Sequence, residues 1–477
     1  MKLYKLIDDC GNFGDTEITN IAFDTSRVEK GSLFFCLKGV KNDGHDYIKE
    51  ACDKGAAAVV SERLIKADVP LIICPDTRHA LSVASKRFYG NAADRLKIYA
   101  VTGTNGKTTT TYMLKAVLES AGFRVGLIGT NAVEFGGNVY PATLTTPDPT
   151  ELHEIFARME QSGVTHVVME ASAHALALKK LDGIRFASVG FTNLSRDHLD
   201  FFGDMESYKR AKLLLFEKDR SDFACADADD PCAQDIASLN GNVLLYGLGL
   251  GAAVRAENLI LTEKGSAFTV NRDGEKEETE ICLPGKYNVY NALCAVSMAI
   301  GTGIGLKDAC RGLKEFKGAE GRFETVHFSR GTVVIDFAHT DDGLKNLLSA
   351  VKEFARGKVI TVFGCGGNRD RTKRPVMGKI AAQNSDTIIV TSDNPRYERP
   401  EDIIADVENG IKTLKSVHYF LEPDRKKAVE KALSMMKEGD VTVIAGKGAE
   451  KYQEIKGVKY PYNDREYVLK LIGGEKN

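Results

Sequence analysis

A glycine-rich segment near residue 100 has the residue types that bind phosphate. It reads Val101-Thr102-Gly103-Thr104-Asn105-Gly106-Lys107-Thr108-Thr109 and lies between an apolar run and a helix-like stretch. A strand that turns on glycines into a helix directs unpaired backbone N–H groups at an anion. Lys107 adds an ammonium for the phosphates and Thr108 a hydroxyl for Mg²⁺, which predicts a nucleoside triphosphate site. The spacing is shorter than in the usual phosphate loop, so a glycine turn with a chance lysine is the alternative.

Two later apolar runs end in groups that bind metal ions. Glu170 ends the run at 166–170, and His198 follows the run that ends at Phe191. Ligands bind at the carboxyl ends of parallel strands, and carboxylate oxygens are ligands that Mg²⁺ prefers. Glu170 is therefore a candidate Mg²⁺ ligand, although a solvated glutamate at a strand end gives the same pattern. Position alone does not decide whether His198 is a ligand or a surface histidine.

Short apolar runs alternate with helical stretches, which predicts an α/β protein of three domains. Residues 1–96 form a small α/β domain with expected strands at 32–37, 57–60 and 71–74 and a helix at 79–89. Residues 97–317 have expected strands at 124–129, 166–169 and 187–191 in a mostly parallel sheet, and an antiparallel hairpin at 267–283 that turns at Asp273-Gly274. Residues 318–477 have expected strands at 332–335, 359–363, 387–390 and 441–444.

The composition excludes several classes of protein. A formal net charge of −2 over 477 residues argues against a general nucleic-acid binder. No apolar run approaches the ~20 residues of a membrane span, and the first residues lack a signal-peptide core. We therefore expect a cytoplasmic protein without nucleic-acid or membrane partners. The ten cysteines include no Cys-x-x-Cys pair, so we expect reduced and mostly buried thiols.

In this order the motifs resemble those of the Mur ligases, the ATP-dependent amino-acid-adding enzymes of peptidoglycan synthesis. Their phosphate loop has the same shortened form, and the resemblance covers nearly the whole chain. It implies a small N-terminal α/β domain, a central phosphate-loop domain with a mostly parallel sheet, and a C-terminal Rossmann-like α/β domain. The implied ATP contacts are Gly103, Thr104, Asn105, Gly106, Lys107, Thr108, Thr109, Asn291 at the base, Arg322 near the terminal phosphate and Asp336 near the ribose.

The resemblance also implies two Mg²⁺ ions and a modified lysine. Thr108 and Glu170 would hold one ion, and His198 would help to hold the second. Lys212, in Ala211-Lys212-Leu213-Leu214-Leu215-Phe216, matches a lysine that is carbamylated in the family. Without the resemblance it is an ordinary lysine on a helix face. A carbamate is an anion, which a site rich in Mg²⁺ can stabilise. Lys107, Lys212, Glu170 and His198 are thus the expected catalytic set.

The substrate contacts implied by the resemblance are those of the tripeptide-forming member of the family. Those expected on the UDP-linked muramoyl-dipeptide are Ser26, Thr145, Thr146, Ser172 and Lys180. Those expected in the amino-acid pocket are Arg369, Asp393, Asn394, Pro395, Arg396, Gly446 and Glu450.

Arg396 indicates which amino acid the pocket accepts. The planar guanidinium pairs in two-pronged fashion with a carboxylate, and it would repel the bare ammonium at the end of a lysine side chain. meso-Diaminopimelate carries a further carboxylate at its far end, so Arg396 suits it, with Arg369 and Glu450 holding the carboxylate and ammonium of that distal centre. The alternative is that Asp393-Asn394-Pro395-Arg396 is only a turn, since Asn-Pro favours turns.

The implied reaction transfers the γ-phosphoryl group of ATP to the glutamate carboxylate of UDP-N-acetylmuramoyl-L-Ala-D-Glu, and the amine then attacks the acyl phosphate. We expect a monomer in which the third domain closes over the second before chemistry. The chain departs from the family at Ala173, Lys180, Asp341, Ala449 and Asn368. A lysine-adding ligase, a divergent paralogue with another carboxylate and amine, and a non-catalytic nucleotide-binding protein are therefore the alternatives.

Overall fold

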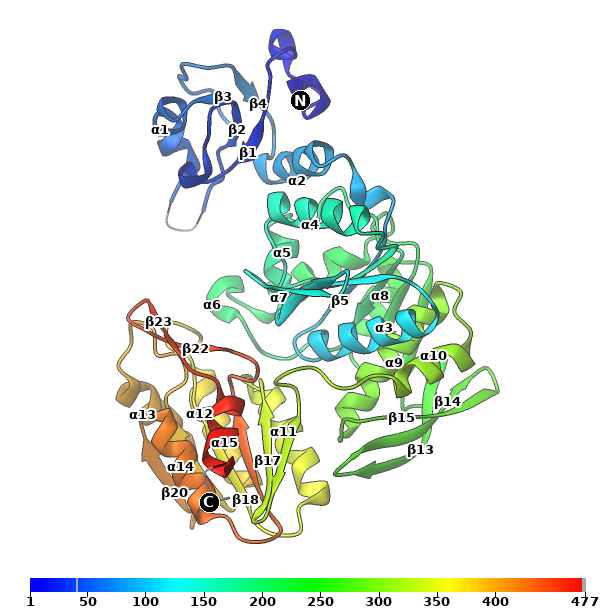
Figure 1. Ribbon diagram of the computed structural model, residues 1–477, viewed down its shortest axis with the longest axis vertical. Helices are drawn as coiled ribbons and strands as arrows, with labels where there is room; N and C mark the ends of the chain where they lie inside the picture. Colours follow the sequence, from blue (N-terminus) through cyan, green and yellow to red (C-terminus); the bar gives the residue numbers. More distant parts are fainter. Residues whose placement is uncertain (40–41, 474–477) are drawn as a thin grey trace. The chain divides into compact units, whose positions relative to one another are not determined.

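The computed structural model describes residues 1–39 and 42–473 (Figure 1). It has the predicted α/β class. Two compact units share the chain: unit 1 contains Met1–Ala100, Phe123–Val189 and Leu214–Asp222, and unit 2 contains Val101–Gly122, Gly190–Leu213 and Phe223–Asn477. Within the described ranges, no helix is both long enough and apolar enough to cross a membrane.

The N-terminal part of unit 1 is a small parallel sheet. Its strands lie in the order β1 (Asn20–Ala22), β2 (Ser32–Phe35), β3 (Ala56–Ser61) and β4 (Leu71–Ile73). Leu33 and Phe35 pack on one face and Phe34 on the other, because successive side chains of a strand alternate. The helices are α1 (Ile48–Asp53) and α2 (Thr77–Phe88), whose first turn is capped by Asp76. The predicted strands and helix of this region are confirmed.

The remaining strands of unit 1 lie in the order β9 (His166–Glu170), β6 (Val125–Ile128), β7 (Ala132–Phe135) and β8 (Asn138–Pro141). Strands β6 and β9 are parallel, as predicted. We did not predict the β7–β8 hairpin, although its Gly136-Gly137 turn is a strong hairpin signal; both glycines have positive φ, 59° and 77°. Helices α4 (Pro149–Gln161) and α5 (Ala173–Ala177) belong to the same unit.

Unit 2 contains the phosphate loop, the helix that follows it, and most of the chain from Gly190 onwards. The last two residues of β5 (Lys97–Thr102) and of β10 (Ser188–Phe191) belong to it. Its strands run β15 (Glu275–Ile281), β14 (Gly265–Arg272), β13 (Val254–Thr262), β12 (Val243–Gly247), β11 (Ala224–Asp227), β10. The predicted β14–β15 hairpin is confirmed, with Asp273 and Gly274 at φ 52° and 93°. The helices are α3 (Lys107–Ser120), α6 (Leu199–Phe202), α7 (Met205–Leu213), α8 (Cys232–Leu239), α9 (Lys286–Gly301) and α10 (Leu306–Lys314).

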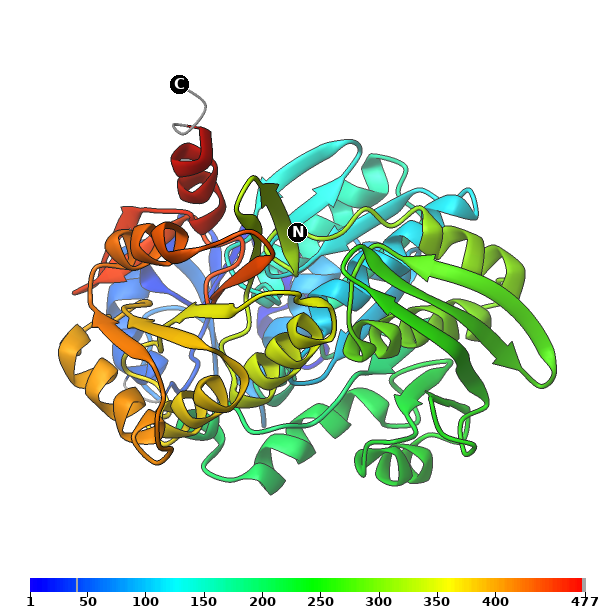
Figure 2. The same ribbon diagram turned by 90° about the horizontal axis from the view of Figure 1, so that it is seen from below.

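The C-terminal sheet of unit 2 has six strands, all parallel except the edge strand β16. They lie in the order β16 (Glu324–Phe328), β17 (Gly331–Asp336), β21 (Asp440–Ala445), β18 (Val359–Phe363), β19 (Thr387–Thr391), β20 (Tyr419–Glu422). Helices α14 (Arg425–Met435) and α15 (Asp464–Gly473) pack on the face that carries Val333 and Ile335. Helices α11 (Asp341–Phe354), α12 (Lys373–Asn384) and α13 (Pro400–Ile411) pack in series with one another (Figures 1 and 2). The small hairpin of β22 (Tyr452–Ile455) and β23 (Val458–Pro461) completes the region.

All ten cysteines are free, and most of them are buried, as predicted. Cys36 and Cys294 lie in the interior, and Cys74 is half-buried.

A buried ion pair fixes α15 to α14. The Arg425 guanidinium donates to both carboxylate oxygens of Asp464, at 2.9 and 2.8 Å, and both side chains are almost fully inaccessible. Arg425 also donates to the carbonyl of Ala445 at 3.0 Å, at the end of β21. The final helix is thereby attached to the strand end that leads to Gly446.

We expect Arg425→Met to lower the free energy of unfolding by about 3–5 kcal/mol, because it leaves the Asp464 carboxylate buried without its charged partner and with only the Tyr462 hydroxyl as a side-chain donor among the described residues. Urea unfolding followed by circular dichroism would measure the change. The matched control is Arg399→Met, since Arg399 pairs with Glu401 at the surface and exposed pairs contribute little. Equal shifts of the unfolding midpoint in the two variants would contradict this prediction.

Candidate active site

The segment from Gly103 to Thr108 forms a tight loop between β5 and α3. Gly103 and Gly106 have φ of 148° and 87°, and α3 begins at Lys107 with Gly106 as its N-cap. A Cβ atom at Gly103 would lie 1.8 Å from Thr192 Oγ1, and one at Gly106 would lie 2.2 Å from Asn291 Oδ1. Both positions therefore require glycine, and the first turn of α3 offers backbone N–H groups as in other anion-binding loops.

Two lysines meet at one carbonyl of this loop. Lys212 Nζ donates to the Gly103 carbonyl at 2.6 Å, and Lys107 Nζ donates to the same oxygen at 3.0 Å and to the Thr104 carbonyl at 3.0 Å. Lys212 is 1% exposed. Burial, and then the nearby charge of Lys107, lower the pKa of Lys212 well below its usual value. The Lys212 amine is thus biased towards its neutral, nucleophilic form.

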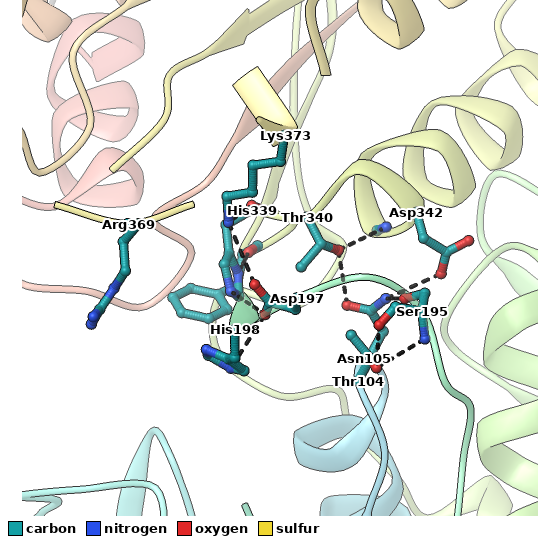
Figure 3. Close-up of polar contacts among 12 residues, drawn as sticks. Thr104, Asn105, Ser195, Asp197, His198, His339, Thr340, Asp342, Arg369 and Lys373 are labelled. Atoms are coloured by element: carbon teal, nitrogen blue, oxygen red, sulfur yellow. Dashed lines mark hydrogen bonds and ion pairs between the residues drawn. The ribbon is translucent and has the colours of Figure 1, made fainter. Parts of the chain in front are cut away.

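Asn105 joins the loop to the start of α11 (Figure 3). Its Nδ2 atom donates to Ser195 Oγ at 3.3 Å and to Asp342 Oδ2 at 3.1 Å. Its Oδ1 atom accepts a hydrogen bond from Thr340 Oγ1 at 3.1 Å, and Thr340 is the N-cap of α11. A residue of the predicted ATP loop therefore contacts the predicted C-terminal domain directly.

Three further residues were expected at the nucleotide. Two of them contact the loop or α3 directly, and the third holds the backbone beside one of these two. Arg322 Nη2 donates to Thr108 Oγ1 at 2.9 Å, and the guanidinium lies over the Phe337 ring. Asp336 accepts hydrogen bonds from the backbone N–H groups of Phe323 and Ala338, both at 2.7 Å, so its carboxylate holds the turn that carries Arg322. Asn291 is buried against Gly106. Their roles at the phosphate, ribose and base stay predictions.

His198 lies beside a buried aspartate that we did not single out from the sequence. His198 Nε2 is 3.3 Å from Asp197 Oδ2, and His198 adopts φ 55° at the N-cap of α6. Asp197 also lies near Lys373 and His339, at 3.6 and 3.8 Å. Burial raises the pKa of Asp197, but Lys373, followed by His339 and His198, lowers it by more, so the pKa lies below its usual value. The missed signal was a carboxylate directly before the candidate ligand, since such partners commonly orient metal-binding histidines.

Glu170 and the residues expected on the muramoyl-dipeptide belong to unit 1. Glu170 ends β9, and Thr130 holds its two carboxylate oxygens through its N–H at 2.8 Å and its hydroxyl at 3.0 Å. Thr145 bonds to Thr130, and Thr146 bonds to the Glu170 carbonyl at 2.8 Å and to Ser172 at 3.3 Å. These contacts make a hydroxyl cluster at the strand end, which includes Thr130, a residue that we did not predict.

Two further residues of the predicted set lie elsewhere in unit 1. Lys180 Nζ is 2.7 Å from Asp148 Oδ1, and Ser26 lies exposed on a short helix behind Asp24, which caps it. Because Glu170 is in unit 1 and Thr108 in unit 2, a metal ion shared by the two stays a prediction.

The predicted amino-acid pocket has a buried polar base. Lys447 is fully buried; its Nζ donates to Asn394 Oδ1 at 3.1 Å and to Glu450 Oε2 at 2.7 Å. Asn394 in turn donates to Glu450 at 3.0 Å. Asp393 Oδ2 is buried without a hydrogen-bond partner among residues 1–39 and 42–473, and it faces Gly446, where a Cβ atom would lie 2.7 Å away. An unsatisfied buried carboxylate oxygen suits a donor from a ligand.

The two arginines of the pocket differ in their contacts. Arg396 has φ 51°; its Nη1 donates to the Gly367 carbonyl at 2.7 Å, and its Nε lies 3.4 Å from Glu454. These contacts leave donors of a five-donor group for a ligand. Arg369 Nη1 lies 3.8 Å from Asp200 Oδ2, and about half of the side chain is exposed. The Pro395 carbonyl lies so close to Gly367 that a Cβ atom at position 367 would be 1.9 Å from it.

Family models match three stretches of the chain. The Mur ligase middle domain matches residues 101–299, the glutamate ligase domain of Mur ligases matches 321–448, and the catalytic domain of the Mur ligase family matches 17–89.

Relatives match over nearly full length. The chain is 41% identical to UDP-N-acetylmuramoyl-L-alanyl-D-glutamate–2,6-diaminopimelate ligase 1 of Clostridium acetobutylicum, over 99% of each chain. It is 42% identical to the diaminopimelate ligase of the same description from Aquifex aeolicus, over 96% of this chain and 94% of that one.

Solved structures of Mur ligases have the same fold as this chain. One that bears the diaminopimelate ligase name superposes with a TM-score of 0.72 at 31% identity, covering 100% of this chain and 99% of the other. The MurF ligase of Thermotoga maritima in complex with ADP has the same fold, with a TM-score of 0.64 at 18% identity over 96% and 98% of the two chains.

Proposed function

The chain belongs to the Mur ligase family, and we propose that it is the ATP-dependent ligase that adds meso-diaminopimelate to the D-glutamate carboxylate of UDP-N-acetylmuramoyl-L-Ala-D-Glu. The relatives that carry the diaminopimelate ligase name, at about 40% identity over nearly the whole chain, support the substrates. The reaction class rests on one observation: Lys107, Lys212 and Arg322 meet at the phosphate loop.

The loop residues fit a bound triphosphate. The glycine cradle admits no side chain, and Lys107 and Arg322 bring positive charge from two elements to its rim. We propose that Lys107 and Arg322 neutralise charge that develops on the γ-phosphoryl group during its transfer to the glutamate carboxylate. No side chain forms a covalent bond to substrate in this scheme. Most of the rate enhancement then comes from positioning and electrostatics.

The metal residues of this proposal are Thr108, Glu170, His198 and Lys212. Hydroxyl, carboxylate and carbamate oxygens suit Mg²⁺, which supplies charge stabilisation to the phosphoryl oxygens when bound. The lowered pKa of Lys212 supports carbamylation, because only the neutral amine attacks CO₂; a C–N bond forms and one proton leaves the nitrogen. Arg322, which bonds Thr108, links this set to the C-terminal sheet.

The amine site of this proposal lies around Arg396, with Asp393, Asn394, Gly446, Glu450 and Arg369 as its further contacts. Asp393 Oδ2 needs a donor, which an ammonium provides, and Arg396 keeps donors for a distal carboxylate. Ser26, Thr145, Thr146, Ser172 and Lys180 are proposed to contact the nucleotide-linked dipeptide. We also propose a cytoplasmic monomer of three domains, 1–96, 97–317 and 318–477, that serves peptidoglycan synthesis and so cell shape and division.

We expect the purified protein, given ATP, Mg²⁺ and UDP-N-acetylmuramoyl-L-Ala-D-Glu, to release phosphate when meso-diaminopimelate is added and not when L-lysine is added. Phosphate release and mass spectrometry of the nucleotide product would measure this. Release with lysine alone would overturn the amine assignment. Release with neither amine would favour the divergent paralogue or the non-catalytic alternative.

A further inference from the structure

Two short segments of unit 2 are joined by three ion pairs. The first is residues 196–200, between β10 and α6, and the second is residues 369–373, at the start of α12. The ion pairs between them are Arg196–Asp370 at 3.1 Å, Asp197–Lys373 at 3.6 Å and Asp200–Arg369 at 3.8 Å. Each segment contributes both basic and acidic side chains to these pairs. We call these contacts the ion-pair clasp.

The Asp197–Lys373 pair is the buried pair of the clasp. Asp197 is 6% exposed and Lys373 7% exposed, while Arg196, Asp200 and Arg369 are partly open to solvent. Lys373 Nζ also donates to the His339 carbonyl at 3.0 Å, and His339 lies beside Asp197 (Figure 3). Removing one partner of a buried ion pair is costly, because it leaves the other charge uncompensated. The Asp197–Lys373 pair therefore ties the start of α12 to residues 196–200.

Each side of the clasp is attached to one half of the candidate active site. On the first side, Ser195 exchanges hydrogen bonds with Thr104 of the phosphate loop, both at 3.0 Å. On the second side, Arg374 donates to the Gly366 carbonyl at 3.3 Å, and the next carbonyl, that of Gly367, accepts from Arg396 at 2.7 Å. The clasp therefore connects the two halves of the candidate site. Hydrogen bonds attach one side of the clasp to the phosphate loop and the other side to the predicted amine pocket.

We propose that Asp197 and Lys373 are positioning residues that hold the amine pocket against the phosphate loop, so that the amine and not water captures the acyl phosphate. This inference rests on the proposed function. The carbonyl carbon of the acyl phosphate has two fates. Attack by the amine forms the amide and releases inorganic phosphate and a proton, whereas attack by water restores the carboxylate and releases inorganic phosphate and a proton. Each fate consumes one ATP, but only attack by the amine forms tripeptide. The ratio of ADP to tripeptide therefore rises above one when water captures part of the acyl phosphate.

The experiment compares ADP and tripeptide formed by the full-length wild type and by Lys373→Met with saturating meso-diaminopimelate. We expect a ratio near one for the wild type and a rise of about threefold or more for Lys373→Met, because a misplaced amine loses its advantage in effective concentration. Lys373→Arg keeps the charge, so its ratio of ADP to tripeptide should lie close to that of the wild type. Lys379→Met, at an exposed site on the same helix, is the matched control and should stay at one.

A second variant covers the case in which Lys373→Met does not fold. Arg196→Gln removes a partly exposed pair and should raise the same ratio by a smaller factor. A purely structural role would lower the rate of both products together and leave the ratio at one in both variants, which would overturn the inference. If the wild type itself forms no ADP with these substrates, the proposed function is wrong. If the wild type is active and the folded variants still give a ratio of one, only this inference is wrong.

Discussion

Lys212→Ala is expected to reduce the rate of tripeptide formation by about three orders of magnitude or more, the scale seen when an enzyme loses a key charge-stabilising group. Lys212 is buried at the phosphate loop, where it donates to the Gly103 carbonyl. The substitution removes the amine that becomes a metal-binding carbamate in our proposal. Tripeptide formation at saturating ATP, Mg²⁺ and both other substrates would measure the loss.

Chemical rescue separates the carbamate from a simple structural role. The cavity left by Lys212→Ala should admit a small carboxylate such as formate or acetate, which supplies the missing anion and should restore part of the rate. A lysine that only anchors the Gly103 carbonyl would not be replaced by an anion. The matched control is Lys209→Ala, on the same helix, whose ammonium pairs with Asp235 near the surface and whose loss should change little. Near-normal activity of Lys212→Ala would remove the carbamate assignment.

Several of the strands that are buried on both faces were predictable. The run at 359–363 coincides with β18, and the run at 441–444 lies inside β21, because buried parallel strands read as continuous apolar runs. Strand β13 has partly exposed residues in alternation and was not predicted. The phosphate loop was predictable because its glycines and lysine act over a few adjacent residues.

Contacts between residues that are far apart in the sequence could not be predicted. Asp197 and Lys373 are brought together by tertiary packing, and no periodicity relates them. The burial of Lys212 could not be read from α7 either, since the helix carries charged residues on several sides. The resemblance to the Mur ligases drew attention to Lys212, whereas the lowered pKa follows from its packing.

Arg396→Ala is expected to raise the KM for meso-diaminopimelate by about 100-fold, because a charge-assisted pair with a carboxylate is worth roughly 2–3 kcal/mol. The KM values for ATP and for the nucleotide-linked dipeptide should change much less. Arg396→Lys keeps the charge and loses the two-pronged geometry, so we expect it to lie between alanine and the wild type. Steady-state kinetics with each substrate varied in turn would measure these values.

The geometry distinguishes Arg396 from its neighbour Arg369. Arg396 is held by the Gly367 carbonyl, whereas Arg369 is half-exposed and has Asp200 within 3.8 Å. Each arginine already has a protein carboxylate beside it, Glu454 at 3.4 Å from Arg396 and Asp200 at 3.8 Å from Arg369. Arg369 is the more exposed of the two and exposed charge pairs contribute less, so Arg369→Ala should raise the KM for meso-diaminopimelate by a smaller factor than Arg396→Ala. Arg399→Ala, at an exposed site of the same region, is the control for loss of an arginine. An equal KM for meso-diaminopimelate in Arg396→Ala and in the wild type would exclude Arg396 as the residue that selects the amine. Arg396 would then no longer argue against the lysine-adding alternative.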